Sequence, residues 1–258
     1  MRRRRALTAL NDAQRRAFHR DGVLVVRGLF PASDVRQQSA WIDELAARPL
    51  ELGKQMVYLE DSLRDPGTRV LSRIEKFAEY HRGLGALVRS PLIVEPVEDL
   101  LGANASLFKD KINFKMPGGG GFAPHQDIQP GWDGYASYFI SVLIAVDTNT
   151  PENGCVELAC GHHTRGLIGR RWAPLEGHEL VGLEFVVCPL APGDAVFFDC
   201  FAPHRSMPNL TDRPRRNIYL TYNRASEGDL RERYFADKRK GYPPDYERDP
   251  AATYAFRV

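Results

Sequence analysis

The second half of the chain alternates between short apolar runs and turn residues, and this pattern constrains the fold more than any other feature. From Leu107 onward, runs of apolar and β-branched residues are separated by Gly, Pro, Asn and Asp. Such runs predict strands, and many short strands with frequent turns predict a sandwich or barrel. Strands and helices do not alternate here, which argues against a parallel α/β sheet. The predicted strands cover residues 107–116, 138–147, 155–158, 183–188, 195–198 and 217–222.

The first 105 residues have a different pattern, which predicts mostly helices. Asn11 or Asp12 can cap a first helix, and Gly22 can end it. A charged segment near the C-terminus has the pattern of a further helix. The expected elements are a strand at 23–26 and helices after Pro31, at 77–89, at 91–101 and at 229–238.

The length of 258 residues fits one domain, since all-β barrels of this size often form a single unit. A chain of this length can bury a substantial core. We expect mainly β structure with flanking helices. The three expected parts are a mostly helical segment, a jelly-roll core and a C-terminal tail, at residues 1–105, 106–225 and 226–258.

The charge balance argues against nucleic acid as a partner. The chain carries 35 Lys and Arg against 33 Asp and Glu, and four of the bases are Arg2, Arg3, Arg4 and Arg5. Without this tail, to which we assign no role, the body is slightly acidic, whereas nucleic-acid binding needs a basic face on the folded domain. No apolar run approaches the ~20 residues of a membrane span, and the N-terminal apolar stretch is too short for a signal peptide.

The cysteines indicate a reducing environment. Their spacing matches neither a CxxC motif nor a zinc ribbon. We expect all four to be buried thiols in a cytoplasmic protein, because disulfides are rare there. The four residues are Cys155, Cys160, Cys188 and Cys200.

A histidine and an aspartate separated by one residue, His125 and Asp127, are the first candidates for chemistry. On an extended segment, residues two apart point to the same side. The imidazole and the carboxylate can then supply two ligands of a 2-His-1-carboxylate facial triad, which holds non-haem Fe(II) and leaves positions open for a co-substrate and oxygen. The tripeptide alone is equally compatible with a loop histidine capped by its neighbour.

A third ligand is expected from a later strand. His204 follows an apolar run, where a barrel would return a side chain to the same mouth. His162 and His163 lie in a Gly-flanked turn and fit a surface position equally well, and His178 fits a solvated loop. Arg215 lies eleven residues after His204. Its guanidinium offers a bidentate fork for the far carboxylate of a dicarboxylate co-substrate.

Together these motifs resemble the phytanoyl-CoA dioxygenase family of Fe(II)/2-oxoglutarate-dependent oxygenases. The resemblance extends from about Leu10 to Tyr222, and its motifs occur in the family's order. These are the stretch DGVLVVRGLF at 21–30, the HxD at His125, the turn Pro192-Gly193-Asp194, and His204 followed by Arg215.

The resemblance implies a double-stranded β-helix, a jelly roll of the cupin type, with Fe(II) as cofactor and 2-oxoglutarate and O2 as co-substrates. It also implies that Arg215 holds the distal carboxylate of 2-oxoglutarate, helped by Ser206. Asn113 matches a polar co-substrate contact in relatives, although its spacing to the HxD differs by about one residue. Related halogenases lack the carboxylate, so its presence here favours hydroxylation. The implied iron ligands are His125, Asp127 and His204.

Within the family, loops at 109–122, 202–212 and 227–240 are similar to bacterial hydroxylases of 2-aminoethylphosphonate and of its N-trimethyl form. This similarity implies hydroxylation at C1, the carbon next to phosphorus, with release of succinate and CO2. A phosphonate needs cationic or NH donors, and a trimethylammonium group needs aromatic faces. The candidate substrate contacts are Gln126, Gln129, Trp132, Lys109, Lys111 and Arg165.

Three alternatives remain open. The chain can be a hydroxylase of another small metabolite, such as an ectoine-like, acyl or natural-product intermediate. It can also be a non-catalytic cupin-like barrel that keeps a metal, or a zinc hydrolase with the same three ligands. The full order of HxD, late histidine and arginine argues against the last two. A small-molecule substrate is expected, with neither nucleic acid nor membrane as partner, and a homo-oligomer is compatible with the sequence.

Overall fold

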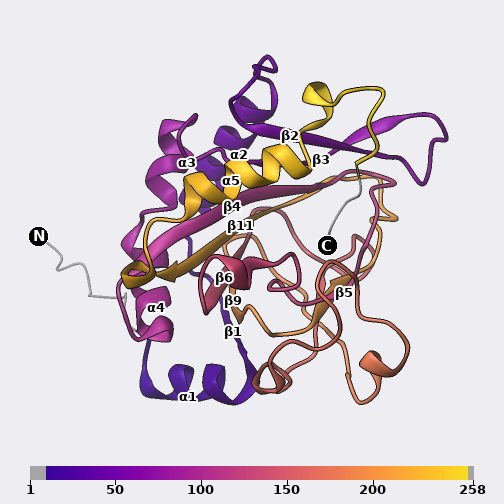
Figure 1. Cartoon of the computed structure of the whole chain (residues 1–258). Helices are drawn as coiled ribbons and strands as arrows, with labels where there is room; N and C mark the ends of the chain where they lie inside the picture. Colours follow the sequence, from indigo (N-terminus) through magenta and orange to yellow (C-terminus); the bar gives the residue numbers. More distant parts are fainter. Residues whose placement is uncertain (1–9, 255–258) are drawn as a thin grey trace, which may run out of the picture.

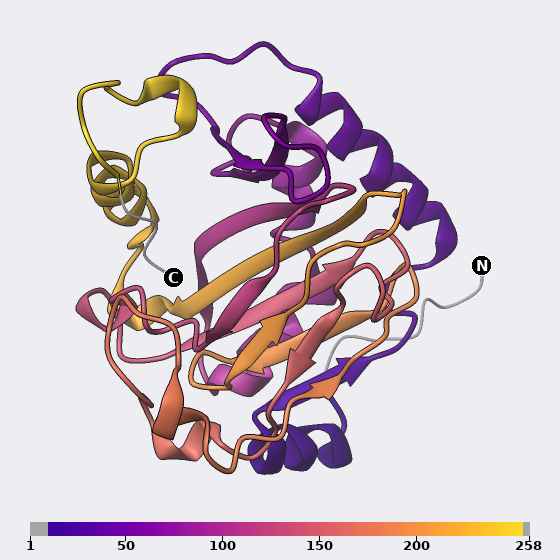
Figure 2. The same cartoon turned by 90° about the vertical axis from the view of Figure 1, so that its right-hand side faces the viewer.

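The computed structural model describes residues 10–254, and Arg2 to Arg5 lie outside this range. Within it, two antiparallel sheets face each other as a jelly roll (Figure 1). The helices between residues 12 and 101 pack on the outer face of the larger sheet, whereas the helix at Arg231–Gly241 lies beside the interior. This confirms the predicted class, mainly β with flanking helices. Figure 2 shows the sheets from the side, with the strands of the small sheet stacked against the large one.

The large sheet has seven strands, and each neighbouring pair is antiparallel. The small sheet has four, and it provides the other wall of the barrel. In spatial order the large sheet contains β1 (Val23–Val26), β9 (Ala195–Asp199), β6 (Phe139–Ala145), β11 (Arg215–Arg224), β4 (Ala105–Lys115), β3 (Arg69–Glu75) and β2 (Met56–Asp61), and the small sheet contains β5 (Phe122–His125), β10 (His204–Ser206), β7 (Val156–Leu158) and β8 (Val186–Val187).

Alternation along β11 separates an apolar face from a polar one. Ile218 and Leu220 belong to the core cluster under the helices, whereas Asn217 lies on the opposite, interior face and is also fully buried. Successive side chains of a strand point to opposite faces, so the buried polar set falls on one side of the sheet. Polar groups thus collect inside the barrel, where a site can form.

Local sequence signals explain the helix ends. Asn11 caps the first helix by accepting from the Gln14 amide at 2.9 Å, and Gly22 ends it with φ 71°. Ser90 caps another helix by accepting from the Leu92 amide. The helices are α1 (Asp12–Asp21), α2 (Ala32–Ala46), α3 (Arg82–Leu87), α4 (Pro91–Leu101) and α5 (Arg231–Gly241).

Four strands of the structure were not predicted from the sequence. β2 and β3 lie in the stretch that was expected to be mostly helical, and they extend the large sheet beyond β4. The strand β3 places charged residues on the interior face, so its pattern lacks the apolar run used to recognise strands. β5 and β10 are three to four residues long, which is too short for a periodic signal.

The cysteine expectation is wrong at one position. Cys155, Cys188 and Cys200 are buried free thiols, but Cys160 is exposed in the turn after β7. Between residues 10 and 254, no helix is long and apolar enough to cross a bilayer.

Candidate active site

Three side chains converge at the mouth of the barrel, where β5 and β10 pair. His204 is the direct partner of His125 in the antiparallel register, and Asp127 follows two residues after β5 ends. The ligand atoms of all three lie within 4.8 Å of one another. The His204 Nε2 atom is 3.8 Å from the Asp127 carboxylate, and the two imidazole rings are 4.2 Å apart between centroids. The sheet therefore brings together the three predicted metal ligands, although 78 residues lie between His125 and His204 in the sequence.

Hydrogen bonds orient each of these side chains. The His125 Nδ1 lies 2.7 Å from the Ala123 carbonyl, and the His204 Nδ1 lies 3.0 Å from the Ala202 carbonyl. Each Nδ1 therefore donates to the backbone, which leaves Nε2 as the free ligand atom. The Ser141 hydroxyl donates to one oxygen of Asp127 and leaves the other oxygen for a metal.

Burial sets the protonation of this group. Burial and the neighbouring His204 together lower the pKa of His125 to about 3, and burial also lowers the pKa of His204. Burial alone would raise the pKa of Asp127, but His204 and Lys111 outweigh it and lower that pKa. Two neutral imidazoles and one carboxylate on one side of a pocket are the donor set typical of non-haem Fe(II).

Arg215 lies at the start of β11, only 2% exposed. Its Nη2 donates to the Gly154 carbonyl at 2.7 Å, and its Nε has no partner. Among residues 10–254, no Asp or Glu forms an ion pair with it. A buried guanidinium without a carboxylate is costly, so this geometry fits an anionic ligand as the missing partner.

Ser206 on β10 and Asn113 on β4 face the interior from the two different sheets. The Ser206 hydroxyl accepts from the Lys115 ammonium at 2.8 Å. Asn113 is buried between Asn217 and Arg73 in the strand register, and its side-chain oxygen has no hydrogen-bond partner. The three expected co-substrate residues, Arg215, Ser206 and Asn113, therefore face one interior space and carry unsatisfied or available polar atoms.

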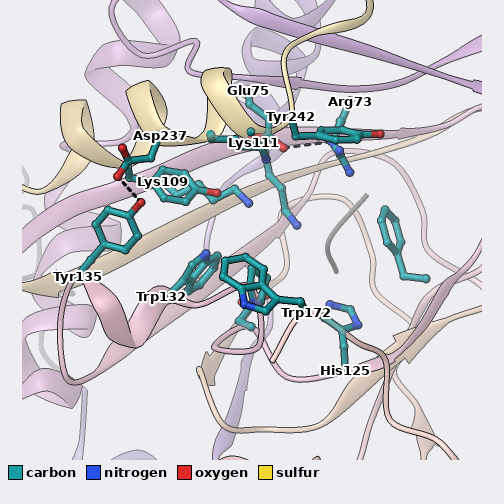
Figure 3. A pocket seen from close by; sticks show the side chains of 16 residues that line it. Arg73, Glu75, Lys109, Lys111, His125, Trp132, Tyr135, Trp172, Asp237 and Tyr242 are labelled. Atoms are coloured by element: carbon teal, nitrogen blue, oxygen red, sulfur yellow. Dashed lines mark hydrogen bonds and ion pairs between the residues drawn. The ribbon is translucent and has the colours of Figure 1, made fainter. Parts of the chain in front are cut away.

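A cavity of about 390 Å³ opens beside His125 and Asp127 (Figure 3). Lys109 and Lys111 point into it from β4, and Trp132 faces them from the opposite side. The remaining lining residues that Figure 3 labels are Arg73, Glu75, Tyr135, Trp172, Asp237 and Tyr242.

The cationic side chains of this cavity differ in whether an acid lies within ion-pair distance. Glu75 lies 3.1 Å from Arg73 and 2.5 Å from Lys238. Burial would lower the pKa of Lys109, but Glu75 and Tyr234 together outweigh it and raise that pKa to about 12. Lys111 forms no ion pair within residues 10–254, and burial together with Lys109 lowers its pKa to about 8. Among residues 10–254, the cavity thus holds one half-buried ammonium, that of Lys111, with no acid within ion-pair distance.

Three predicted substrate contacts lie elsewhere. Gln126 bonds the Gly166 carbonyl at 2.8 Å and also the Ile168 amide, and Gln129 bonds two carbonyls of the same loop. Both amides are fully used in holding the loop, and neither side chain lines the cavity. Arg165 lines a separate surface hollow with residues 167–179. None of these three side chains therefore lies where a substrate in the cavity would contact it.

Sequence reasoning missed several functional candidates. Arg73 and Glu75 come from β3, and Lys238 comes from α5, far from the motifs in sequence. Lys115 has a recognisable signal, because Lys109, Lys111, Asn113 and Lys115 alternate along one strand and must share one face.

The chain is similar to a known protein family over most of its length. The model of the family described as phytanoyl-CoA dioxygenase (PhyH) matches residues 18–217. A methylphosphonate hydroxylase from Gimesia maris is 37% identical, with 91% of this chain and 89% of that protein covered. A 2-aminoethylphosphonate dioxygenase from Uncultured bacterium HF130_AEPn_1 is 36% identical, with 96% and 95% covered.

A solved structure shares the fold. EctD from S. alaskensis, crystallised with 2-oxoglutarate and 5-hydroxyectoine, matches with a TM-score of 0.74 at 24% identity, covering 84% of this chain and 77% of that one. The family match spans both metal-ligand motifs and Arg215, and the two curated relatives cover nearly the whole chain. The chain belongs to the phytanoyl-CoA dioxygenase (PhyH) family.

Proposed function

We propose that the protein is an Fe(II)- and 2-oxoglutarate-dependent hydroxylase of a small phosphonate. The reaction inserts one oxygen atom of O2 into the C–H bond next to phosphorus, while the other oxidises 2-oxoglutarate to succinate and CO2. The preferred substrate is 2-aminoethylphosphonate or its N-trimethyl form. The observation that carries the proposal is the unpaired Lys111 ammonium, which points into the cavity beside the His-Asp-His group.

The residues of the barrel mouth fit the cofactor. The Nε2 atoms of His125 and His204 and one oxygen of Asp127 would hold the iron, since the backbone and Ser141 occupy their other polar atoms. The bound iron would activate O2 for the oxidative decarboxylation of 2-oxoglutarate and the hydroxylation of substrate. The unpartnered Nε of Arg215 and side-chain oxygen of Asn113 fit a polar co-substrate on the same face.

The charge of the cavity supports a phosphonate. Lys111 has no carboxylate partner, and Lys109 and Arg73 add positive charge on the same wall. A doubly charged phosphonate group would satisfy these donors through charge-assisted hydrogen bonds. Anchored there, the substrate places its first carbon toward His125 and Asp127, which line the same cavity.

The opposite wall supports an ammonium group. Trp132, Tyr135 and Trp172 line it, and Asp237 lies at its edge. Aromatic faces attract ammonium and trimethylammonium groups, and a carboxylate adds to that attraction for a primary amine. The similarity to a 2-aminoethylphosphonate dioxygenase over nearly the full length agrees with this arrangement.

Methylphosphonate is a second candidate. The relative that is a methylphosphonate hydroxylase is as similar as the aminoethylphosphonate relative. Methylphosphonate has the same anionic group but no ammonium, so it would use only the lysine wall.

The test is succinate formation and phosphorus NMR of the product, with Fe(II), 2-oxoglutarate and a panel of substrates. The panel contains 2-aminoethylphosphonate, its N-methylated series, methylphosphonate, ectoine and an acyl-CoA. We expect coupled turnover with a phosphonate and none after His204→Ala. Turnover with only ectoine or only the acyl-CoA would contradict a phosphonate as the substrate. Full activity of His204→Ala would contradict the proposed role of His204 as a metal ligand.

A further inference from the structure

Two buried cations lie directly opposite each other at one end of the β4–β11 pair. Lys115 and Arg215 are partners in the register, and each is 2% exposed. Neither forms an ion pair with an acid of the described chain, and Glu60 and Glu157 are the acids that face Lys115 from beyond ion-pair distance. Like charges opposed across a sheet destabilise it, and burial increases that cost.

Both cations are directed at the same neutral oxygen. The Gly154 carbonyl accepts from Arg215 Nη2 at 2.7 Å and from Lys115 Nζ at 3.4 Å. Lys115 also donates to the Met207 carbonyl and, at 2.8 Å, to the Ser206 hydroxyl. A carbonyl carries no net charge, so these contacts orient the two cations without neutralising them.

The contact between Lys115 and Ser206 determines which of the two groups donates the hydrogen bond. An ammonium can only donate, so the Ser206 oxygen accepts from Lys115. The hydroxyl proton of Ser206 has no acceptor among the side chains and carbonyls of residues 10–254. It is therefore available to a ligand placed between Ser206 and Arg215.

We propose that Lys115 is a positioning residue of the 2-oxoglutarate site, which supplies the second positive charge for the distal carboxylate and orients Ser206 to donate to it. This inference rests on the proposed function, because it assumes that 2-oxoglutarate is the co-substrate. The anion at this position would balance two cations and accept from Ser206 and Arg215 together. Lys115 itself need not touch the co-substrate, since its three donors are already used.

The test compares two 2-oxo acids that differ only at the far end. 2-Oxopentanoate has the chain length of 2-oxoglutarate but ends in a methyl group. Both are titrated anaerobically into the Fe(II)-loaded protein, and dissociation constants are measured by calorimetry. Because the ratio of the two constants is taken within one variant, a fraction of unfolded protein affects both equally.

We expect Lys115→Met to raise the dissociation constant of 2-oxoglutarate about 10- to 100-fold, because Ser206 is no longer oriented to donate to the charged carboxylate. The dissociation constant of 2-oxopentanoate should change by less than about threefold. Ser206→Ala should lower the same ratio, and the double variant should lose less than the two single losses combined, because both act on one hydroxyl. Lys115→Gln keeps an N–H donor without the charge and gives the same test if Lys115→Met does not fold.

The matched control is Lys111→Met, which removes a half-buried lysine from the same face of the same strand. It should leave the ratio unchanged. Two results would overturn the role of Lys115. One is an equal rise of both dissociation constants in Lys115→Met, and the other is a change of their ratio in Lys111→Met as large as that in Lys115→Met. If the unmodified protein shows no preference for 2-oxoglutarate, the proposed function itself fails.

Discussion

At the scale of single residues, the role of each buried charge depends on its partner. Arg73, Lys109 and Lys238 share the carboxylate of Glu75, and together they form one wall of the cavity. Lys111 has no such partner. Lys109 and Lys111, two residues apart on β4, thus differ in whether an acid lies within reach, which is why Lys111 carries the proposed phosphonate site.

The substrate affinity should depend on pH through Lys111. Burial and Lys109 lower its pKa to about 8, so the ammonium is present below that pH and is lost above it. The KM for a phosphonate should therefore rise as the pH increases beyond 8. Lys111→Met should raise the KM at pH 7 by at least about tenfold and remove this alkaline limb. Steady-state kinetics between pH 6.5 and pH 9 measures both, and an unchanged alkaline limb in the variant would contradict the assignment to Lys111.

At the scale of elements, α5 forms part of the cavity wall and is attached to the sheet by ion pairs. Arg231 at its start bonds Glu79 at 2.7 Å and also the fully buried Asp110 of β4. Asp110 in turn accepts from the Phe77 and Ala78 amides. The helix, the strand and the segment before α3 therefore meet at one buried carboxylate.

Removing Arg231 should destabilise the protein strongly. Arg231→Met leaves Asp110 buried without its cation, for which we expect a loss of about 3–5 kcal/mol in the free energy of unfolding. The control is Arg233→Met on the same helix, whose exposed pair with Asp237 should contribute less than about 1 kcal/mol. Urea unfolding of both variants measures the difference, and similar losses would refute the special role of Asp110.

The turn before β7 should tolerate no side chain at Gly154. This residue has φ 71°, and a Cβ there would lie 2.0 Å from the Met207 carbonyl and 2.8 Å from Lys115 Nζ. Gly154→Ala should therefore destabilise the fold and weaken 2-oxoglutarate binding. Gly53→Ala, at φ 78° with open space around it, should show only the left-handed strain of about 1–2 kcal/mol. Thermal unfolding and co-substrate titration compare the two, and equal behaviour would contradict the steric argument.

At the scale of the whole molecule, the jelly roll collects residues from distant segments around one interior space. The large sheet contributes Arg215 and the lysines, and the small sheet contributes the two histidines. The pairing of β5 with β10 places His125 beside His204, and Asp127 follows two residues later. Ligand binding should therefore stabilise the global fold.

Fe(II) and 2-oxoglutarate should raise the midpoint of thermal unfolding. A ligand that binds only the folded state at a hundred times its dissociation constant adds about 2.7 kcal/mol. We expect this gain under anaerobic conditions, its loss with a chelator, and its absence in Asp127→Ala. Differential scanning calorimetry provides the measurement, and an unchanged midpoint at saturating ligand would argue against a preformed site.

The sequence predicted the elements whose signals are local. The caps at Asn11 and Gly22 and the long apolar strands were found because caps and periodicity depend on neighbours along the chain. β3 was missed because its interior residues are charged, and that pattern has meaning only beside the cavity that it lines.

The sequence alone was enough to predict the donor set, because the types and order of His125, Asp127, His204 and Arg215 already indicate the chemistry. Only the tertiary structure decided the surroundings: which lysine has a carboxylate partner, that Gln126 holds a loop, and that Lys115 opposes Arg215. The physical reason is that charge balance and hydrogen bonding depend on distances across the sheets, and these distances exist only after the strands have paired.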